Sequence, residues 1–343
     1  MVVTGGAGGS QVAAPESVRE VLSAEEIRSL TRLSDWAGAR ALLVSWGIIW
    51  GSLFAAGWWP SWLTIPLALV LLGGRQLGLS ILMHEASHRS LFKTRALNDV
   101  LGKWLCAAPV WSRLPAYRTH HLQHHNYANS PRDPDLGLVT PFPTSKLSVL
   151  RKLARDILGV TGARRVVGLF AMDLGFLSYT ASTGATRKDP LAEGGLSLVI
   201  KQALHNLGPV LATNAVMAGL LWWAGIGWTF ALWVGAYLTT FSLFLRLRAL
   251  AEHACTSMVE NPFWHTRTTK AHAVARLTVA PHNVNYHLEH HLLMTVPHQS
   301  LPRMHALLVE RGAIPPARFA SGYWEVLRQV SAGRGGAPDA SPA

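Results

Sequence analysis

The sequence predicts an all-α integral membrane protein, with four transmembrane helices in two hairpins and a cytoplasmic helical cap. Three observations indicate this fold class. The 343 residues are 49% hydrophobic and only 15% charged, and the charged share lies well below the roughly 25% of ordinary soluble domains. The mean hydropathy is positive, at +0.20. The apolar residues gather in long runs, and the basic residues gather between those runs.

The first predicted hairpin consists of two apolar runs, 36–59 and 62–83, joined by a turn at Pro60 and Ser61. Each run contains the roughly 20 residues that are needed to cross the hydrocarbon core of a bilayer. Arg75 interrupts the second run. We expect its side chain to point into the helix bundle, because an ionisable group at that depth needs protein partners.

The second predicted hairpin consists of the runs 207–223 and 228–250, joined by the uncharged segment 224–227. Both interhelical turns lack Lys and Arg, whereas the other loops are rich in them. By the positive-inside rule the two turns lie outside, and both termini and the cap lie in the cytoplasm. We expect the inner membrane of a bacterium. This orientation accounts for the formal net charge of +12 without nucleic acid, since no basic run is interleaved with aromatic residues.

The remaining segments are polar, and neither an internal repeat nor a second domain is visible. Ser23 and Glu26 form a capping box at the start of a short helix before the first span. The predicted parts are an N-terminal tail with a short amphipathic helix at 1–35, a membrane domain at 36–330 whose cap comprises 84–205 and 251–330, and a disordered tail at 331–343.

Histidine is the compositional anomaly, with sixteen residues, whereas the two cysteines form neither a C-x-x-C pair nor a disulfide framework. Residues three and four apart share one face of a helix. Histidines recur at that spacing in three clusters, and a further histidine follows the fourth span. All of them fall on the predicted cytoplasmic side. The nine candidate metal ligands are His84, His88, His121, His124, His125, His253, His287, His290 and His291.

Nine imidazoles exceed what one metal ion needs. Imidazole suits iron, zinc and copper, and two five- or six-coordinate ions would use this many donors while leaving positions open. Iron is favoured, because four ligands normally satisfy zinc. One alternative stays open at the first cluster, since 84–88 also matches the H-E-x-x-H pattern of zinc metalloproteases. A second alternative is a membrane transporter whose histidines bind the transported ion.

These clusters resemble the three histidine boxes of the membrane-bound fatty acid desaturase and hydroxylase superfamily: H-x-x-x-H at 84–88, and H-x-x-H-H at both 121–125 and 287–291. The resemblance covers residues 36–311, with the spacing of the boxes and the four-span layout. It implies that the nine histidines bind two iron ions, with O2 as co-substrate. His253 matches the lone ligand that precedes the third box in this family.

Residues next to the clusters are candidates to orient the ligands, since metal-bound histidines commonly donate a hydrogen bond to a carboxylate. His120 points off the shared face, and Asn283 lies one turn before His287. Other histidines, such as His282, are expected to lie outside the ligand set. The candidates for this supporting role are Glu85, His120, Asp133, Asp135, Asn283 and Glu289.

The favoured reaction is desaturation of a fatty acyl lipid, and the open alternative is a hydroxylase or ketolase acting on a lipid, a carotenoid or an alkane. An apolar tunnel would suit an acyl chain, and Trp104, Trp111, Trp223 and Trp228 could line it. The chain shows no cysteine cluster, dinucleotide fingerprint or haem module. Electrons are therefore expected from a separate carrier, ferredoxin-like or cytochrome b5-like, and the basic surface favours an acidic one.

Overall fold

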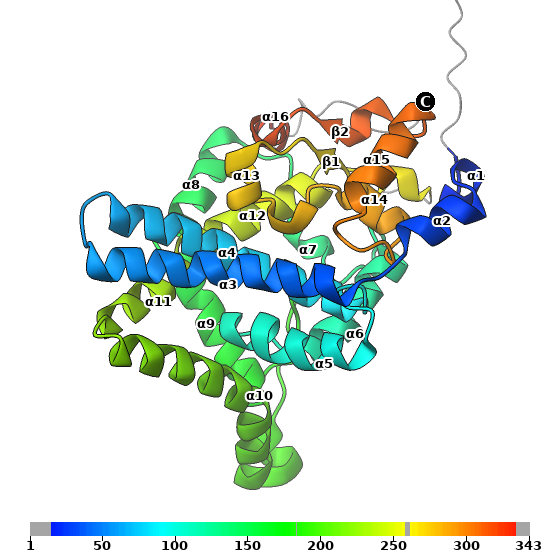
Figure 1. Ribbon diagram of the computed structural model, residues 1–343. Helices are drawn as coiled ribbons and strands as arrows, with labels where there is room; N and C mark the ends of the chain where they lie inside the picture. The colour runs from blue at the N-terminus through cyan, green and yellow to red at the C-terminus, as the bar shows by residue number, and fades with distance from the viewer. Residues whose placement is uncertain (1–14, 183, 258–260, 334–343) are drawn as a thin grey trace, which may run out of the picture.

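The computed structural model describes residues 15–182, 184–257 and 261–333. The described chain is mostly helical, as predicted, and has one parallel pair of two-residue strands, β1 (Thr268–Thr269) and β2 (Phe319–Ala320) (Figure 1). The predicted disordered tails lie mostly outside these residues. The α-helices are α1 Val18–Val21, α2 Ala24–Leu30, α3 Asp35–Trp58, α4 Thr64–Ser87, α5 Arg95–Leu101, α6 Leu114–Tyr127, α7 Leu136–Val139, α8 Lys146–Ile157, α9 Val160–Asp173, α10 Pro190–Trp223, α11 Phe230–Leu238, α12 Thr240–His253, α13 Ala273–Leu277, α14 His287–Leu292, α15 Leu301–Glu310 and α16 Tyr323–Val330.

Helices α3 and α4 form the predicted first hairpin and lie side by side (Figure 1). The bounds of α3 agree with the prediction to within one residue. Helix α4 begins two residues later than predicted and continues four residues past Met83, because residues 84–87 are buried and pack as part of the core. His84 therefore lies inside this helix and not in a separate cap, and His88 caps its C-terminal end.

Helix α4 is the centre of the fold, and it packs against α3, α11, α12 and the short helices around it. Close packing depends on Gly73, where an added Cβ atom would lie 2.2 Å from the Thr240 hydroxyl on α12. Arg75 points into the bundle, which confirms the prediction. Its side chain is 3% exposed and donates hydrogen bonds of 3.1 and 2.9 Å to the carbonyl oxygens of Arg276 and Leu277.

The second hairpin differs from the prediction. Helix α10 is 34 residues long, starts well before 207, and bends at Gly195, where φ is +65°. In the described part of the chain, three helices are long and apolar enough to cross a membrane: Asp35–Trp58, Thr64–Ser87 and Gly227–His253. The predicted span 207–223 is not among them, because Pro209 and Asn214 interrupt its apolar run.

The fourth predicted span is a helical segment that breaks at Thr239, where ψ is −86°, into α11 and α12. The residues just before α11 lie beside the C-terminal end of α3, where the first hairpin turns. An added Cβ atom at Gly57 of α3 would come within 2.7 Å of the Ile226 side chain. The opposite ends, at His88 of α4 and His253 of α12, both lead into the histidine clusters. The two hairpins thus turn at one end of the bundle and present histidines at the other.

The C-terminal helices α13 to α16 lie together above α3 and α4 in Figure 1, with α14 at the histidines and α13 over the middle of α4, against Gly74 and Arg75. Helices α2 and α15 pack against each other there. The predicted capping box is confirmed at the start of α2, where the Ser23 amide donates to Glu26 at 2.8 Å and the Glu26 amide donates to Ser23 Oγ at 3.2 Å. Glu26 also forms an ion pair with Arg311.

Candidate metal centre

Four helices bring the nine histidines to one place. His84 and His88 come from the last turn and the cap of α4, and His253 is the last residue of α12. Helix α6 carries the second cluster and α14 the third. Each helix is held by apolar neighbours on its other faces, so the imidazoles are presented by rigid segments and not by loops.

The histidines form two groups, and within each group one nitrogen atom from every residue lies within 4.8 Å of the others. The five-histidine group consists of His84, His88, His121, His125 and His290. The four-histidine group consists of His124, His253, His287 and His291. All nine histidines are therefore used, and no carboxylate belongs to either group.

Each H-x-x-H-H cluster is divided between the two groups. On α6, the i, i+4 pair His121 and His125 belongs to the five-histidine group, and His124 belongs to the other. On α14 the assignment is reversed, since His287 and His291 join the four-histidine group and His290 crosses to the other. Both helices therefore bridge the two groups, which places the groups next to each other.

The ring nitrogens face one another at short distances. Nε2 of His125 lies 3.0 Å from Nε2 of His121 and 3.1 Å from Nε2 of His290, and the Nε2 atoms of His287 and His253 are 2.8 Å apart. Buried polar atoms without a partner cost free energy. Within the nine histidines, the buried ring nitrogens with no hydrogen-bond partner among the described residues are both nitrogens of His84 and of His88, Nδ1 of His253, His287 and His290, and Nε2 of His291.

This donor set fits metal ions, because converging neutral imidazoles supply lone pairs that a cation would satisfy together. Burial, together with neighbouring charged groups, lowers the pKa of His88 to about 4 and that of His125 to about 2. Burial likewise moves the pKa of His121, His287, His290 and His291 well below the ordinary value. These rings are neutral at pH 7, which is the form that binds a metal.

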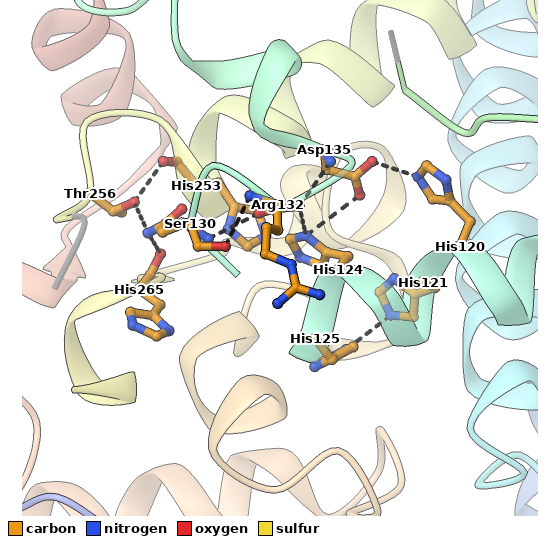
Figure 2. A network of polar contacts seen from close by, with 12 residues as sticks. His120, His121, His124, His125, Ser130, Arg132, Asp135, His253, Thr256 and His265 are labelled. Atoms are coloured by element: carbon orange, nitrogen blue, oxygen red, sulfur yellow. Dashed lines mark hydrogen bonds and ion pairs between the residues drawn. The ribbon is translucent and has the colours of Figure 1, made fainter. Parts of the chain in front are cut away.

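Asp133 and Asp135 contact the histidine rings of α6 on the side away from the other histidine clusters. Nδ1 of His124 lies 2.8 Å from an oxygen of Asp133 and 3.7 Å from Asp135, and His120 Nε2 lies 2.8 Å from Asp135 (Figure 2). Burial alone would lower the pKa of His124, but the bond to Asp133 and the nearby acidic charges raise it. The predicted carboxylate support is therefore placed next to His124, and His120 lies outside both groups.

Glu85 lies beside a candidate ligand, as expected, whereas Glu289 contacts residues outside the nine histidines. Glu85 lies 3.4 Å from His84 Nδ1, but its second oxygen accepts a hydrogen bond of 2.9 Å from the His298 amide. Glu289 is fully buried and is bound by His305 Nδ1 at 2.6 Å and by the Thr268 hydroxyl, neither of which belongs to the nine histidines.

The Asn283 side chain donates a hydrogen bond of 3.0 Å to the His298 carbonyl oxygen, so it supports the chain that follows α14. His282 lies at 2.8 Å from the Ser45 hydroxyl, outside both groups. The sequence also left Glu252 unassigned. Its carboxylate lies 3.5 Å from His287 Nδ1 and 2.6 Å from Arg248 Nε. Its position directly before His253 is the signal that could have identified it.

A cavity of about 610 Å³ adjoins the two groups. Its wall includes His121 from the five-histidine group and His124, His253 and His287 from the four-histidine group. Of the four tryptophans expected to line a tunnel, only Trp111 belongs to this wall. Trp104, Trp223 and Trp228 are 38%, 87% and 45% exposed, as bilayer-facing or interfacial residues are.

Fold and site together define a helical membrane protein with nine histidines arranged to hold metal beside a cavity. The family model "Fatty acid desaturase" matches residues 60–320, and this chain belongs to that family. The family is known for a di-iron centre, for lipid substrates and for oxidoreductase activity. The zinc-protease hypothesis is not supported, because the chain belongs to the desaturase family and because H-E-x-x-H accounts for only two of the nine clustered histidines.

Three curated relatives illustrate the range of the family. The chain is 30% identical over 241 residues to dihydrorhizobitoxine desaturase of Bradyrhizobium elkanii, covering 69% of this chain and 65% of that protein. It is 22% identical over 279 residues to an sn-1 oleoyl-lipid 12-desaturase of Synechocystis, covering 79% and 75%. It is 31% identical over 120 residues to zeaxanthin 4-ketolase of Chlamydomonas reinhardtii, covering 30% and 27%.

Proposed function

We propose that this protein is an O2-dependent di-iron oxidoreductase that introduces a double bond into a fatty acyl chain, with electrons from a separate carrier. The observation that carries the proposal is the division of nine buried or half-buried histidines into groups of five and four beside a cavity of about 610 Å³. Membership of the fatty acid desaturase family supports it, as does the Synechocystis relative named for oleoyl-lipid desaturation.

In this proposal the five-histidine group holds one iron and the four-histidine group holds the other. Iron accepts up to six donors, so five and four imidazoles would leave positions open. Bound and reduced, the irons would activate O2 so that hydrogen is removed from two neighbouring carbons. The overall reaction consumes O2, two electrons, two protons and the saturated chain, and yields the alkene and two molecules of water.

The residues of this chain supply position and exclusion of water. Asp133 holds the His124 ring through Nδ1 at 2.8 Å, so that Nε2 points inward. Glu252 lies at 3.5 Å from Nδ1 of His287. The cavity wall between α9 and α12 contains Leu169, Met172 and Leu245, which offer apolar contact to a methylene chain.

We further propose four spans, with both termini and the metal centre in the cytoplasm of a bacterium and 207–223 as the third span. The contact of Gly57 with Ile226 supports this, because it puts both uncharged turns at one end of the bundle. The histidine ends of α4 and α12 lie at the other end, where the loops are basic. A ferredoxin-like or cytochrome b5-like carrier would dock on that basic face.

Hydroxylation or ketolation is the second candidate, favoured by the similarity of 120 residues to zeaxanthin 4-ketolase. Both outcomes begin with removal of hydrogen from an unactivated carbon. They differ in whether a second hydrogen leaves or oxygen is added. The substrate of that relative is a carotenoid, so a carotenoid or an alkane would replace the acyl lipid in this alternative.

Product analysis after expression in a heterologous host decides between the candidates. The chain is produced with a ferredoxin and its reductase, and the His290→Ala variant serves as the inactive control. Our proposal expects new unsaturated acyl chains that are absent from the control. New hydroxyl or keto groups would establish the second candidate, and unchanged lipids despite full iron loading and a working electron donor would refute an acyl substrate.

A further inference from the structure

The cavity beside the metal centre follows helix α12 for most of its length. Ser242, Leu245, Ala249 and His253 of that helix all line it. Ser242 precedes His253 by eleven residues, which corresponds to about 16 Å along the helix axis at a rise of about 1.5 Å per residue. The histidines therefore lie at one end of the cavity along α12, and Ser242 lies at the opposite end.

Five arginines line this cavity, and three of them have a carboxylate partner. Arg113 pairs with Asp173 at 3.2 Å, Arg248 pairs with Glu252 at 2.6 Å, and Arg246 pairs with Asp156. Arg164 is exposed to solvent. Among the described residues, no carboxylate forms an ion pair with Arg165; Asp156 acts on it only at longer range and is paired directly with Arg246.

Arg165 extends from α9 to the far end of the cavity wall. One of its terminal nitrogens, Nη2, donates to the Ser242 hydroxyl, and the guanidinium lies 5.1 and 4.9 Å from the rings of Tyr237 and Phe241. The other terminal nitrogen, Nη1, is buried and has no hydrogen-bond partner among the described residues. A buried cation in this state is costly, and an anion would stabilise it.

A second unsatisfied donor lines the same cavity. The Ser182 hydroxyl is buried, and no described residue accepts or donates a hydrogen bond to it. The aromatic rings beneath Arg165 fix the plane of its guanidinium. A fixed guanidinium fork is suited to bind carboxylate or phosphate oxygens, which accept several hydrogen bonds at once.

We propose that Arg165 binds an acidic group, a carboxylate or a phosphate, at one end of the substrate, while the chain extends along α12 to the histidines. This inference rests on the proposed function, because it takes the cavity to hold the molecule that the metal centre oxidises. At C–C bond lengths of about 1.5 Å, the distance of about 16 Å corresponds to a chain on the order of a dozen bonds. The substrate is then an amphipathic acid and not a neutral glycerolipid.

Binding of three spin-labelled probes to the iron-loaded, full-length protein in nanodiscs tests this proposal: stearate, its methyl ester and stearyl phosphate. A charge-assisted hydrogen bond between buried groups predicts that wild type binds an acidic probe about thirtyfold tighter than the ester. Arg165→Gln removes this preference and leaves ester binding and iron content unchanged. Arg165→Lys retains part of it, and Arg155→Gln, at an exposed arginine of α8 that does not line the cavity, retains all of it.

The two acidic probes distinguish the sources of the anion, since a carboxylate substrate favours stearate and a phospholipid headgroup favours stearyl phosphate. If wild type bound the acidic probes and the methyl ester equally well, that result alone would overturn the proposal. The proposal would also be overturned if Arg165→Gln still bound the acidic probes about thirtyfold tighter than the ester. Binding is measured separately from turnover. If the acidic probes bind more tightly but are not oxidised, the proposed reaction is refuted and the role of Arg165 is not. If the ester is oxidised as readily as the acid, only the role of Arg165 in binding an acidic group is refuted.

Discussion

The two histidine groups have different surroundings, although the same two helices contribute to both. Three of the four members of the four-histidine group line the cavity, and Asp133 and Glu252 lie against its rings. Of the five-histidine group, only His121 lines the cavity. If both groups hold iron as proposed, the ion in the five-histidine group would lie inside the protein and the ion in the four-histidine group would face the cavity.

The largest effect is expected from removing one donor of either group. His290→Ala and His291→Ala should each abolish activity and reduce the iron content by about one ion per chain, because a bound ion loses a donor and an imidazole cannot be replaced by a methyl group. The measurement is metal content by mass spectrometry beside product formation. Full iron content in either variant would remove that histidine from the ligand set.

Asp133→Asn tests the support of the four-histidine group. A neutral amide orients His124 more weakly, and loss of such a partner typically costs about 10–100-fold in metal affinity or activity. Asp135→Asn is the matched control, because Asp135 lies 3.7 Å from the same nitrogen and Asp133 lies at 2.8 Å. An equal effect of both substitutions would show that Asp133 has no special role.

Glu289→Gln tests a contact that holds α14 in place, and this helix carries members of both groups. Its carboxylate is buried and is bound by His305 at 2.6 Å and by Thr268. Losing hydrogen bonds to a buried charge should cost about 1.5–3 kcal/mol of stability, measured as a lower unfolding temperature. Exposed Glu310→Gln on α15 is the control. Release of iron from only one group would contradict this shared role.

The smallest expected effect is a difference in the pH at which the two groups release metal. The pKa of His124 is raised, whereas those of His88 and His125 lie at about 4 and about 2. As pH falls, protons therefore compete for His124 first, and the four-histidine group should lose its iron at the higher pH. Iron retained after incubation at stepwise lower pH measures this. A single release step would indicate that the groups do not differ.

Local spacing was enough to predict which i, i+4 histidine pairs share a group, but not where the third member of each triplet lies. The i, i+4 pair on α14, His287 and His291, shares one group as expected from the helix period. Spacing could not predict that His290 crosses to the other group, because that depends on how α14 packs against α4 and α6. The partner of Glu289 was equally invisible, since His305 lies on a different helix sixteen residues away.

The fold shows the same limit. Apolar runs located α3 to within one residue, because a long hydrophobic helix has few alternative positions. The same reasoning ended α4 too early, at Met83, because His84 and Glu85 are polar in the sequence but buried in the core. It also missed the bend at Gly195 and the break at Thr239, which depend on tertiary packing.

The central claim is that the nine histidines hold two iron ions, and metal analysis of the purified wild-type protein tests it most directly. The protein is produced in iron-rich medium, and iron and zinc are counted against protein concentration. Our account predicts about two irons per chain, one for each group of imidazoles. One zinc per chain, or no iron at all, would contradict it.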